Sequence, residues 1–168
     1  MAPEEIAARA TIARLRADIA EERRALARCT DDLADATRRL VATPSDRAAL
    51  VLAAFALHGW YTGFESIAER VVRQLDASIP TGDRWHRELL SQISVEVPGV
   101  RPPVVPRALI GDLAALLGFR HFFRHSYGID LDVTRLELER IRLERIAPSV
   151  ATSLDGFDAF LTSAMTSA

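Results

Sequence analysis

The chain contains no lysine, so all 21 of its basic residues are arginine. This absence excludes a Schiff-base lysine and the lysine of a phosphate-binding P-loop. The single cysteine, Cys29, has no second cysteine within the chain with which to form a disulfide bond. The sequence opens without a recognisable secretory signal, and its longest apolar run, residues 48–57, is too short to cross a bilayer. We therefore expect a cytoplasmic protein with no membrane-spanning segment.

Aromatic residues make up only 7% of the chain, whereas hydrophobic residues make up 49%, and many of these are alanine. Alanine-rich, glycine-poor segments with interleaved charges favour helices over sheets. The length of 168 residues suits one sizeable core, so we expect a single helical domain over residues 1–168. The net charge of -2 gives no overall basic field, so a nucleic-acid partner would need a local basic patch.

Hydrophobic periodicity predicts an all-α fold, an antiparallel bundle of four to five helices. Apolar residues recur in steps of three and four from Ile12 to Leu40, which is typical of a long helix packed against others. The segment 97–106 holds four prolines and one glycine, so it is expected to be a loop. The helices are expected at approximately residues 12–40, 44–75, 83–93, 107–127 and 132–161.

Residues that favour or disrupt helix ends refine this prediction. Thr43 followed by Pro44 is expected to cap the second helix and to begin it. Gly59 and Gly63 weaken that helix, so we expect them to allow close approach of a neighbouring helix. Pro148 is expected to kink the last helix or to break it in two.

The residues with the clearest chemical potential lie near the end of the fourth expected helix. Ile110, Leu113 and Leu117 form an apolar stripe, and Arg120 and Arg124 continue it. Charged side chains are seldom buried without a partner, because desolvation costs several kcal/mol. The stripe therefore indicates an anion site or a subunit interface. The alternative is a buried ion pair with a glutamate of an earlier helix, such as Glu65 or Glu69.

Two histidines accompany these arginines. His121 and His125 are spaced to share one helix face, as the two histidines of a zinc site often are. A phenylalanine, Phe122, stands where the catalytic glutamate of an H-E-x-x-H site would follow, and no third ligand is evident. We therefore expect chemistry without a metal or cofactor. Trp85 and His86 are interpreted as structural residues, the tryptophan in the core and the histidine partly exposed.

The spacing Arg120-x4-His125-x-Tyr127 resembles the motif of HEPN-domain ribonucleases, in particular the HepT-like toxins of toxin–antitoxin pairs. The flanking segments 58–70, 80–90 and 97–102 are similar to the corresponding parts of HepT-like proteins. In that family a polar residue, usually asparagine, follows the arginine, whereas this chain has His121. The resemblance implies a HEPN-like, dimeric helical bundle and a metal-independent endoribonuclease.

The resemblance also implies roles for the motif residues. Arg120 and His125 would be catalytic, with His121 and Arg124 supporting RNA binding. An imidazole that titrates near neutral pH suits proton transfer to and from the ribose hydroxyl groups, and a guanidinium suits a charged phosphate. Tyr127 would be the residue that a cognate MntA-type nucleotidyltransferase antitoxin modifies with AMP.

Five residues along an ideal helix rotate by about 140°, so Arg120 and His125 do not share one face of a regular helix. The two side chains converge if the helix end unwinds or if a second protomer completes the site. The resemblance favours the second option, a homodimer that binds RNA between its protomers.

One rival hypothesis belongs to another functional class. A HEPN-like bundle can act as a non-catalytic partner that presents a nucleotide or substrate to a nucleotidyltransferase. In that case Arg120 and His125 bind an anion and cleave nothing. A third reading, a purely scaffolding bundle, requires the basic stripe to be paired internally.

Overall fold

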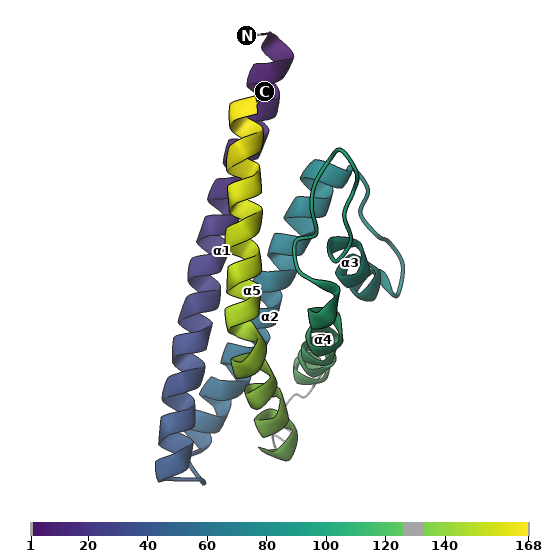
Figure 1. Cartoon of the computed structure of the whole chain (residues 1–168). Helices are drawn as coiled ribbons and strands as arrows, with labels where there is room; N and C mark the ends of the chain where they lie inside the picture. Colours follow the sequence, from purple (N-terminus) through teal and green to yellow (C-terminus); the bar gives the residue numbers. More distant parts are fainter. Residues whose placement is uncertain (1, 126–132, 168) are drawn as a thin grey trace.

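The computed structural model describes residues 2–125 and 133–167, and this part of the chain is helical with no strand. The all-α prediction is therefore confirmed (Figure 1). The α-helices are α1 (Pro3–Ala42), α2 (Arg47–Val71), α3 (Trp85–Ile93), α4 (Ile110–His125) and α5 (Val133–Ser167). A π-helical turn, η1 (Val72–Asp76), extends α2, and a 3₁₀ turn, η2 (Arg107–Leu109), leads into α4.

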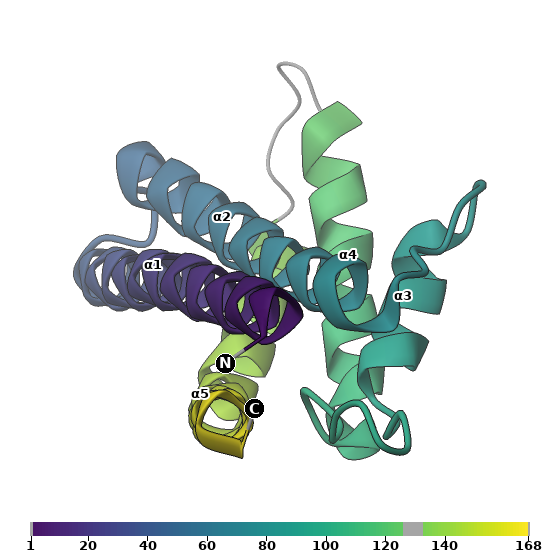
Figure 2. The same cartoon turned by 90° about the horizontal axis from the view of Figure 1, so that it is seen from above.

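Helix α2 lies at the centre of the bundle, in contact with the other four α-helices. It forms an antiparallel hairpin with α1, and α5 returns along α1 so that the two ends of the chain lie near each other (Figure 1). Seen from above, α3 and α4 lie on the opposite side of α2 from α1 (Figure 2). Two layers of helices thus share α2, and any site between α2, α3 and α4 is built on the central element.

The core confirms the periodicity that predicted the first two helices. Leu15, Ile19, Leu26, Leu33 and Ala36 are the buried residues of α1, all on the expected seam. Of the apolar residues that recur at helical spacing from Leu50 to Leu75, the two end residues are only partly buried. Helix α2 is buried on more than one face, because its buried residues include the others of this stripe and residues between them. These are Ala49, Ala53, Ala54, Ala56, Leu57, Trp60, Tyr61, Gly63, Phe64, Glu65, Ile67, Ala68 and Val71.

Two glycines bring α1 and α2 together, as predicted. A Cβ atom on Gly59 would lie 3.1 Å from Sγ of Cys29, and one on Gly63 would lie 3.0 Å from Cδ2 of Leu26. Both distances are shorter than ordinary van der Waals contact, so a Cβ atom at either position would require the neighbouring side chain on α1 to shift.

The predicted start of the second helix is wrong. Thr43 ends α1, and α2 begins three residues after Pro44, with Asp46 as its N-cap. The Asp46 carboxylate accepts a hydrogen bond of 3.0 Å from the backbone N–H of Ala49. A carboxylate satisfies a free helical N–H and suits the positive end of the helix dipole, which explains why the cap lies at Asp46.

Helix α5 continues through Pro148, so the predicted break does not occur. Buried residues lie on both sides of the proline: Leu143 and Ile146 before it, Val150 and Leu154 after it. Packing on both sides holds the helix together although the proline lacks one backbone donor.

The proline-rich loop 97–106 is confirmed, and a buried arginine anchors it. Arg101, whose side chain is fully buried, donates hydrogen bonds of 2.7 Å from Nε and from Nη2 to the two carboxylate oxygens of Asp76. Its Nη1 donates to the backbone carbonyls of Val95 and Pro102, and Nη2 also donates to that of Gln92. The loop that precedes α4 is thereby fixed to the end of η1.

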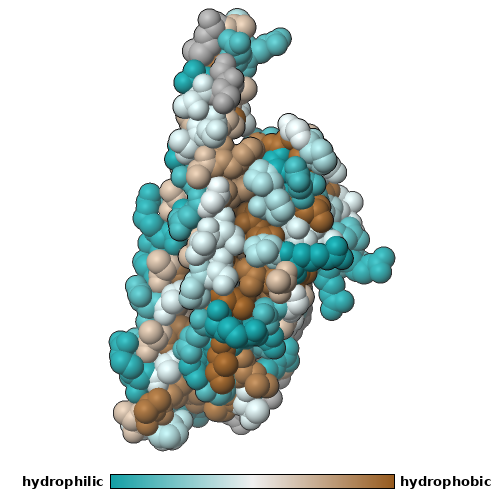
Figure 3. Space-filling view, viewed as in Figure 1, coloured by the Kyte–Doolittle hydropathy of each residue, from teal (hydrophilic) through white to brown (hydrophobic). Residues whose placement is uncertain are grey.

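The surface mixes polar and apolar residues. Hydrophobic residues gather mainly along the middle of the face in Figure 3, with hydrophilic residues around them. Among the described residues, no helix combines the length and the apolar character that crossing a membrane requires.

Candidate functional site

Arg120 lies where the apolar stripe of α4 predicts it, facing the bundle. Leu113 and Leu117 are buried, and Arg120 itself is only 9% exposed. Its Nη1 lies 2.9 Å from Oε2 of Glu65 on α2. Of the two glutamates that were candidate partners, Glu65 is the one that pairs, because Glu69 lies 3.9 Å from Arg73 instead.

Glu65 has a second partner on a third helix. Its other oxygen, Oε1, lies 2.5 Å from Nδ1 of His86 on α3. The Glu65 side chain is 5% exposed, that of Arg120 is 11% exposed and that of His86 is 15% exposed. One buried carboxylate therefore joins α2, α3 and α4.

Aromatic rings hold the imidazole of His86 in place. The ring of Trp85 stacks on it with centroids 3.7 Å apart, and the ring of His121 meets it edge-on at 4.9 Å. His121 is a motif residue, so His86 lies in the same cluster as Arg120 and His121. We call Glu65, His86, Arg120 and His121 the Glu65 cluster.

The guanidinium of Arg120 is only partly used by this contact. Its Nε and Nη1 atoms are buried and have no hydrogen-bond acceptor among the described residues. Nη1 is close to Glu65, but its N–H groups are not directed at the carboxylate, so the contact is electrostatic. A buried donor without an acceptor costs about 1–3 kcal/mol, and Arg120 therefore retains donors for a further acceptor.

Tyr61 lies in the core beneath this cluster. Burial raises the pKa of its phenol far above the ordinary value, the Glu65 carboxylate raises it further, and Arg120 opposes both effects. The hydroxyl is therefore neutral at every physiological pH. Tyr61 is 1% exposed and is therefore a packing residue of the core.

The structure brings together only part of the predicted motif. Arg120 and His121 are both in the Glu65 cluster. Helix α4 runs to His125, but the side chains of Arg124 and His125 lie outside the described residues, as does the whole of Tyr127. No group of three or more potential metal ligands occurs among the residues that are described.

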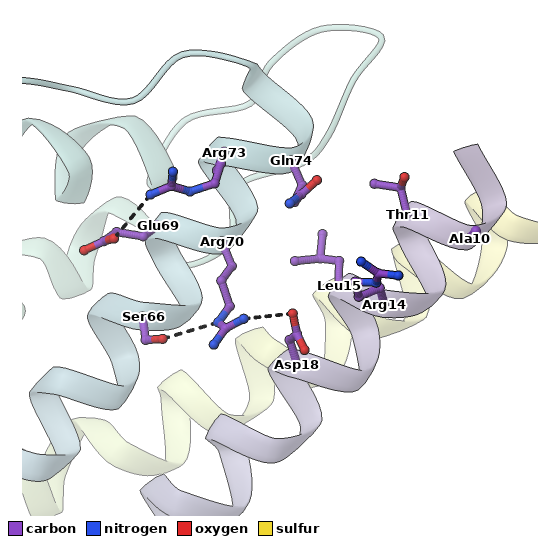
Figure 4. Close-up of a pocket in the computed structure, with 10 residues that line it drawn as sticks. All are labelled: Ala10, Thr11, Arg14, Leu15, Asp18, Ser66, Glu69, Arg70, Arg73 and Gln74. Atoms are coloured by element: carbon purple, nitrogen blue, oxygen red, sulfur yellow. Dashed lines mark hydrogen bonds and ion pairs between the residues drawn. The ribbon is translucent and has the colours of Figure 1, made fainter. Parts of the chain in front are cut away.

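A separate cavity of about 440 Å³ lies between α1 and the end of α2, extended by η1 (Figure 4). Arg70 points into it and contacts Asp18 at 2.8 Å, while Arg73 lies near Glu69. Neither Arg120 nor His121 lines this cavity, and acidic residues of the cavity pair with two of its three arginines, Arg70 and Arg73. The Glu65 cluster is therefore the better candidate for the function that the motif implies.

His86 is the residue whose part in the site the sequence did not reveal. It is interpreted from the sequence as a partly exposed structural histidine, yet it contacts Glu65, which lies 21 residues earlier. Its only local signal is the neighbouring Trp85, whose ring covers one face of the imidazole. Nothing in helical periodicity predicts a contact between residues separated by a helix end and a loop.

Comparison with known proteins supports the resemblance seen in the motif. A family model described as HepT-like protein matches residues 52–161, more than half of the chain. The match includes Glu65, His86 and Arg120. No curated protein and no solved structure matches the chain. Most of the central helix, the proline-rich loop and the arginine-bearing helix α4 fall within the matched residues, and the chain therefore belongs to the family of HepT-like proteins.

Proposed function

We propose that this HepT-like protein is a metal-independent endoribonuclease toxin, formed by a single domain over residues 1–168. Membership of the HepT-like family supports ribonuclease toxin activity at the family level. The observation that carries the proposal is the buried guanidinium of Arg120, which stands in register for an Arg-x4-His motif and keeps two nitrogens without an acceptor among the described residues.

The reaction needs no metal ion. The 2′-hydroxyl of the RNA loses its proton and attacks the adjacent phosphorus, and the bond to the 5′-oxygen breaks as that oxygen gains a proton. The products are a 2′,3′-cyclic phosphate and a 5′-hydroxyl. His125 serves the proton transfers, and Arg120 stabilises the negative charge that builds on the phosphate oxygens. DNA lacks the 2′-hydroxyl and is therefore not a substrate.

His121 and Arg124 contribute RNA contacts beside the reacting phosphate. His121 already lies against His86 in the Glu65 cluster, one residue from Arg120. A second imidazole and a second guanidinium increase the affinity for a polyanion, because each can donate charge-assisted hydrogen bonds to phosphate oxygens.

The active form is a homodimer whose protomers share the site. Apolar side chains at the α2–α4 face support self-association there: Phe55 is 60% exposed and Val51 is 46% exposed. Phe123 of α4 meets Phe55 edge-on, with ring centroids 5.2 Å apart. Exposed aromatic surface next to a polar cluster is a common feature of interfaces.

A cognate MntA-type nucleotidyltransferase antitoxin controls the nuclease in the cytoplasm. Its proposed target is Tyr127, two residues after His125 in the sequence. AMP on this tyrosine introduces a phosphodiester near the arginines of the motif and competes with the RNA backbone for them.

The second candidate function is a non-catalytic, anion-binding partner of a nucleotidyltransferase. The ion pair between Arg120 and Glu65 favours it, because the carboxylate compensates the charge that a ribonuclease would direct at phosphate. In that case the Glu65 cluster binds a nucleotide or polyanion without breaking a bond.

Cleavage of a labelled RNA panel in the presence of EDTA decides between the two. Wild-type protein is expected to leave 2′,3′-cyclic phosphate ends, and His125→Ala prepared in parallel is expected to leave the RNA intact. Equal cleavage by the two proteins would contradict the role of His125. No cleavage by folded, unmodified wild-type protein would favour the binding partner.

A further inference from the structure

We infer that Glu65 and His86 are positioning residues of the ribonuclease site, with His86 holding the carboxylate of Glu65 and Glu65 holding the guanidinium of Arg120. This inference rests on the proposed function, which it deepens. Neither residue belongs to the Arg-x4-His-x-Tyr motif, and His86 lies on α3, a different helix from the motif.

The geometry forms a chain of contacts from His86 to Arg120. Nδ1 of His86 lies 2.5 Å from one oxygen of Glu65, and the other oxygen lies 2.9 Å from Nη1 of Arg120. Each carboxylate oxygen thus has its own partner on a separate helix. A carboxylate held on both oxygens cannot rotate to follow one partner alone, so it sets where the positive charge of Arg120 lies.

The imidazole is itself fixed. Trp85 covers one face of the ring at 3.7 Å, and the edge-on contact with His121 limits rotation further. Hydrogen bonding of Nδ1 to a carboxylate selects the tautomer that carries its proton on Nδ1 when the ring is neutral. His86 then acts on Glu65 as a donor, and its Nε2 is the ring nitrogen that Glu65 does not use.

A second buried arginine, Arg101, has a purely structural role, and its hydrogen bonding differs from that of Arg120. Arg101 uses Nε, Nη1 and Nη2 in hydrogen bonds to Asp76 and to backbone carbonyls. Arg120 meets Glu65 at Nη1, and its Nε and Nη1 lack hydrogen-bond acceptors among the described residues. A network built only for stability would satisfy these donors, as the one around Arg101 does.

Positioning matters because Arg120 acts on the additional negative charge that builds on the phosphate oxygens in the transition state. A guanidinium that moves by about 1 Å can lose on the order of 100-fold in rate. We therefore expect Glu65→Gln to lower kcat by about 100-fold while KM for RNA changes by less than about threefold. Glu69→Gln, one helical turn later and paired with Arg73, is the matched control and is expected to keep wild-type kinetics.

Variants of His86 provide a second test of the positioning role if Glu65→Gln fails to fold. Asparagine at position 86 places an amide N–H close to the position of Nδ1 but cannot titrate. His86→Asn is expected to retain most of kcat and its pH profile, whereas His86→Ala loses about tenfold or more. Equal losses in both variants would overturn the inference, since they would mean that His86 transfers protons itself or that any change here is disruptive.

A double-mutant cycle tests whether Glu65 works through Arg120. In an Arg120→Lys background, Glu65→Gln is expected to change kcat by less than about twofold, because the group that it positions is already absent. Full additivity of the two losses would overturn the inference. Asp76→Asn is the control for a carboxylate with a structural role, because Asp76 pairs with Arg101. This variant is expected to have a lower Tm and an unchanged kcat at a temperature at which it is folded.

A further measurement separates this inference from the proposed nuclease activity. Nitrogen-15 NMR of histidine-labelled protein, with His86→Asn to assign the signal, is expected to find the neutral His86 ring protonated on Nδ1. A proton on Nε2 instead would overturn the inference whatever the activity. If wild-type protein cleaves nothing, the proposed function fails, and the position of the proton on His86 alone then tests whether His86 holds the carboxylate of Glu65.

Discussion

Glu65 and Arg120 join α2 to α4 through an ion pair in which Oε2 of the carboxylate lies 2.9 Å from Nη1 of the guanidinium. Both side chains are almost fully buried, so each depends on the other for compensation of its charge. A buried pair of this kind often adds little net stability over an apolar pair, but loss of one partner leaves a charge in a poorly solvated place.

Removal of the carboxylate should therefore destabilise the fold. We expect Glu65→Gln to lower the free energy of unfolding by about 3 kcal/mol, because Arg120 loses its counter-charge. The double variant Glu65→Gln/Arg120→Met is expected to recover part of the loss. Urea unfolding followed by circular dichroism measures both, with Glu69→Gln as the control at a partly exposed glutamate, expected within about 0.5 kcal/mol of wild type. A Glu65→Gln value no larger than that of the control would contradict the argument.

The close approach of α1 and α2 at Gly63 should make even an alanine side chain destabilising there. Gly63→Ala places a Cβ 3.0 Å from Cδ2 of Leu26, and we expect a loss of about 1–3 kcal/mol. Gly156→Ala in α5 is the matched control, since its Cβ would meet nothing within 4 Å. That substitution is expected to stabilise the protein by up to about 1 kcal/mol through helix propensity. Thermal unfolding of the two variants measures the difference, and similar Tm values would contradict it.

The stability that the contact between α1 and α5 contributes should decrease at acidic pH. Arg16 donates two hydrogen bonds to the carboxylate of Asp158, and these bonds hold the pKa of that carboxyl below its ordinary value. The stability from this pair is present above the unfolded pKa of about 4 and is lost as the pH falls through the lower folded pKa. Asp158→Asn should thus cost about 0.2–1 kcal/mol at pH 7 and almost nothing near pH 2, by urea unfolding. An equal cost at both pH values would show that charge is not the cause.

The proposed modification of Tyr127 makes a separate prediction. Tyr127→Phe should leave the far-ultraviolet circular dichroism spectrum and RNA cleavage unchanged, because the hydroxyl has no part in the proposed chemistry. Incubation with the cognate nucleotidyltransferase and ATP should add AMP to wild-type protein and not to the variant, as intact-mass spectrometry would detect. Tyr61→Phe, at a tyrosine that is buried in the core, is the matched control and should be modified like wild type. AMP on the Tyr127→Phe protein would refute the assigned position.

The sequence by itself determined the helices and much of their burial. Residues that recur every three to four positions share a helix face, and this local rule predicted the seam of α1 from Leu15 to Ala36 and the inward direction of Arg120. It also named Glu65 as one of two possible partners for an arginine of the stripe. The motif identified the HepT-like family, which the family match then supported.

Only the tertiary structure decided which groups meet. The choice of Glu65 over Glu69, and the contact of Glu65 with His86, depend on how α2, α3 and α4 are rotated against one another. That rotation results from the packing of many side chains at once, so neither a single residue nor a local spacing predicts it. The unbroken α5 has the same origin, since contacts on both sides of Pro148 outweigh the local effect of the proline, whereas the N-cap at Asp46 follows from a local hydrogen bond with Ala49.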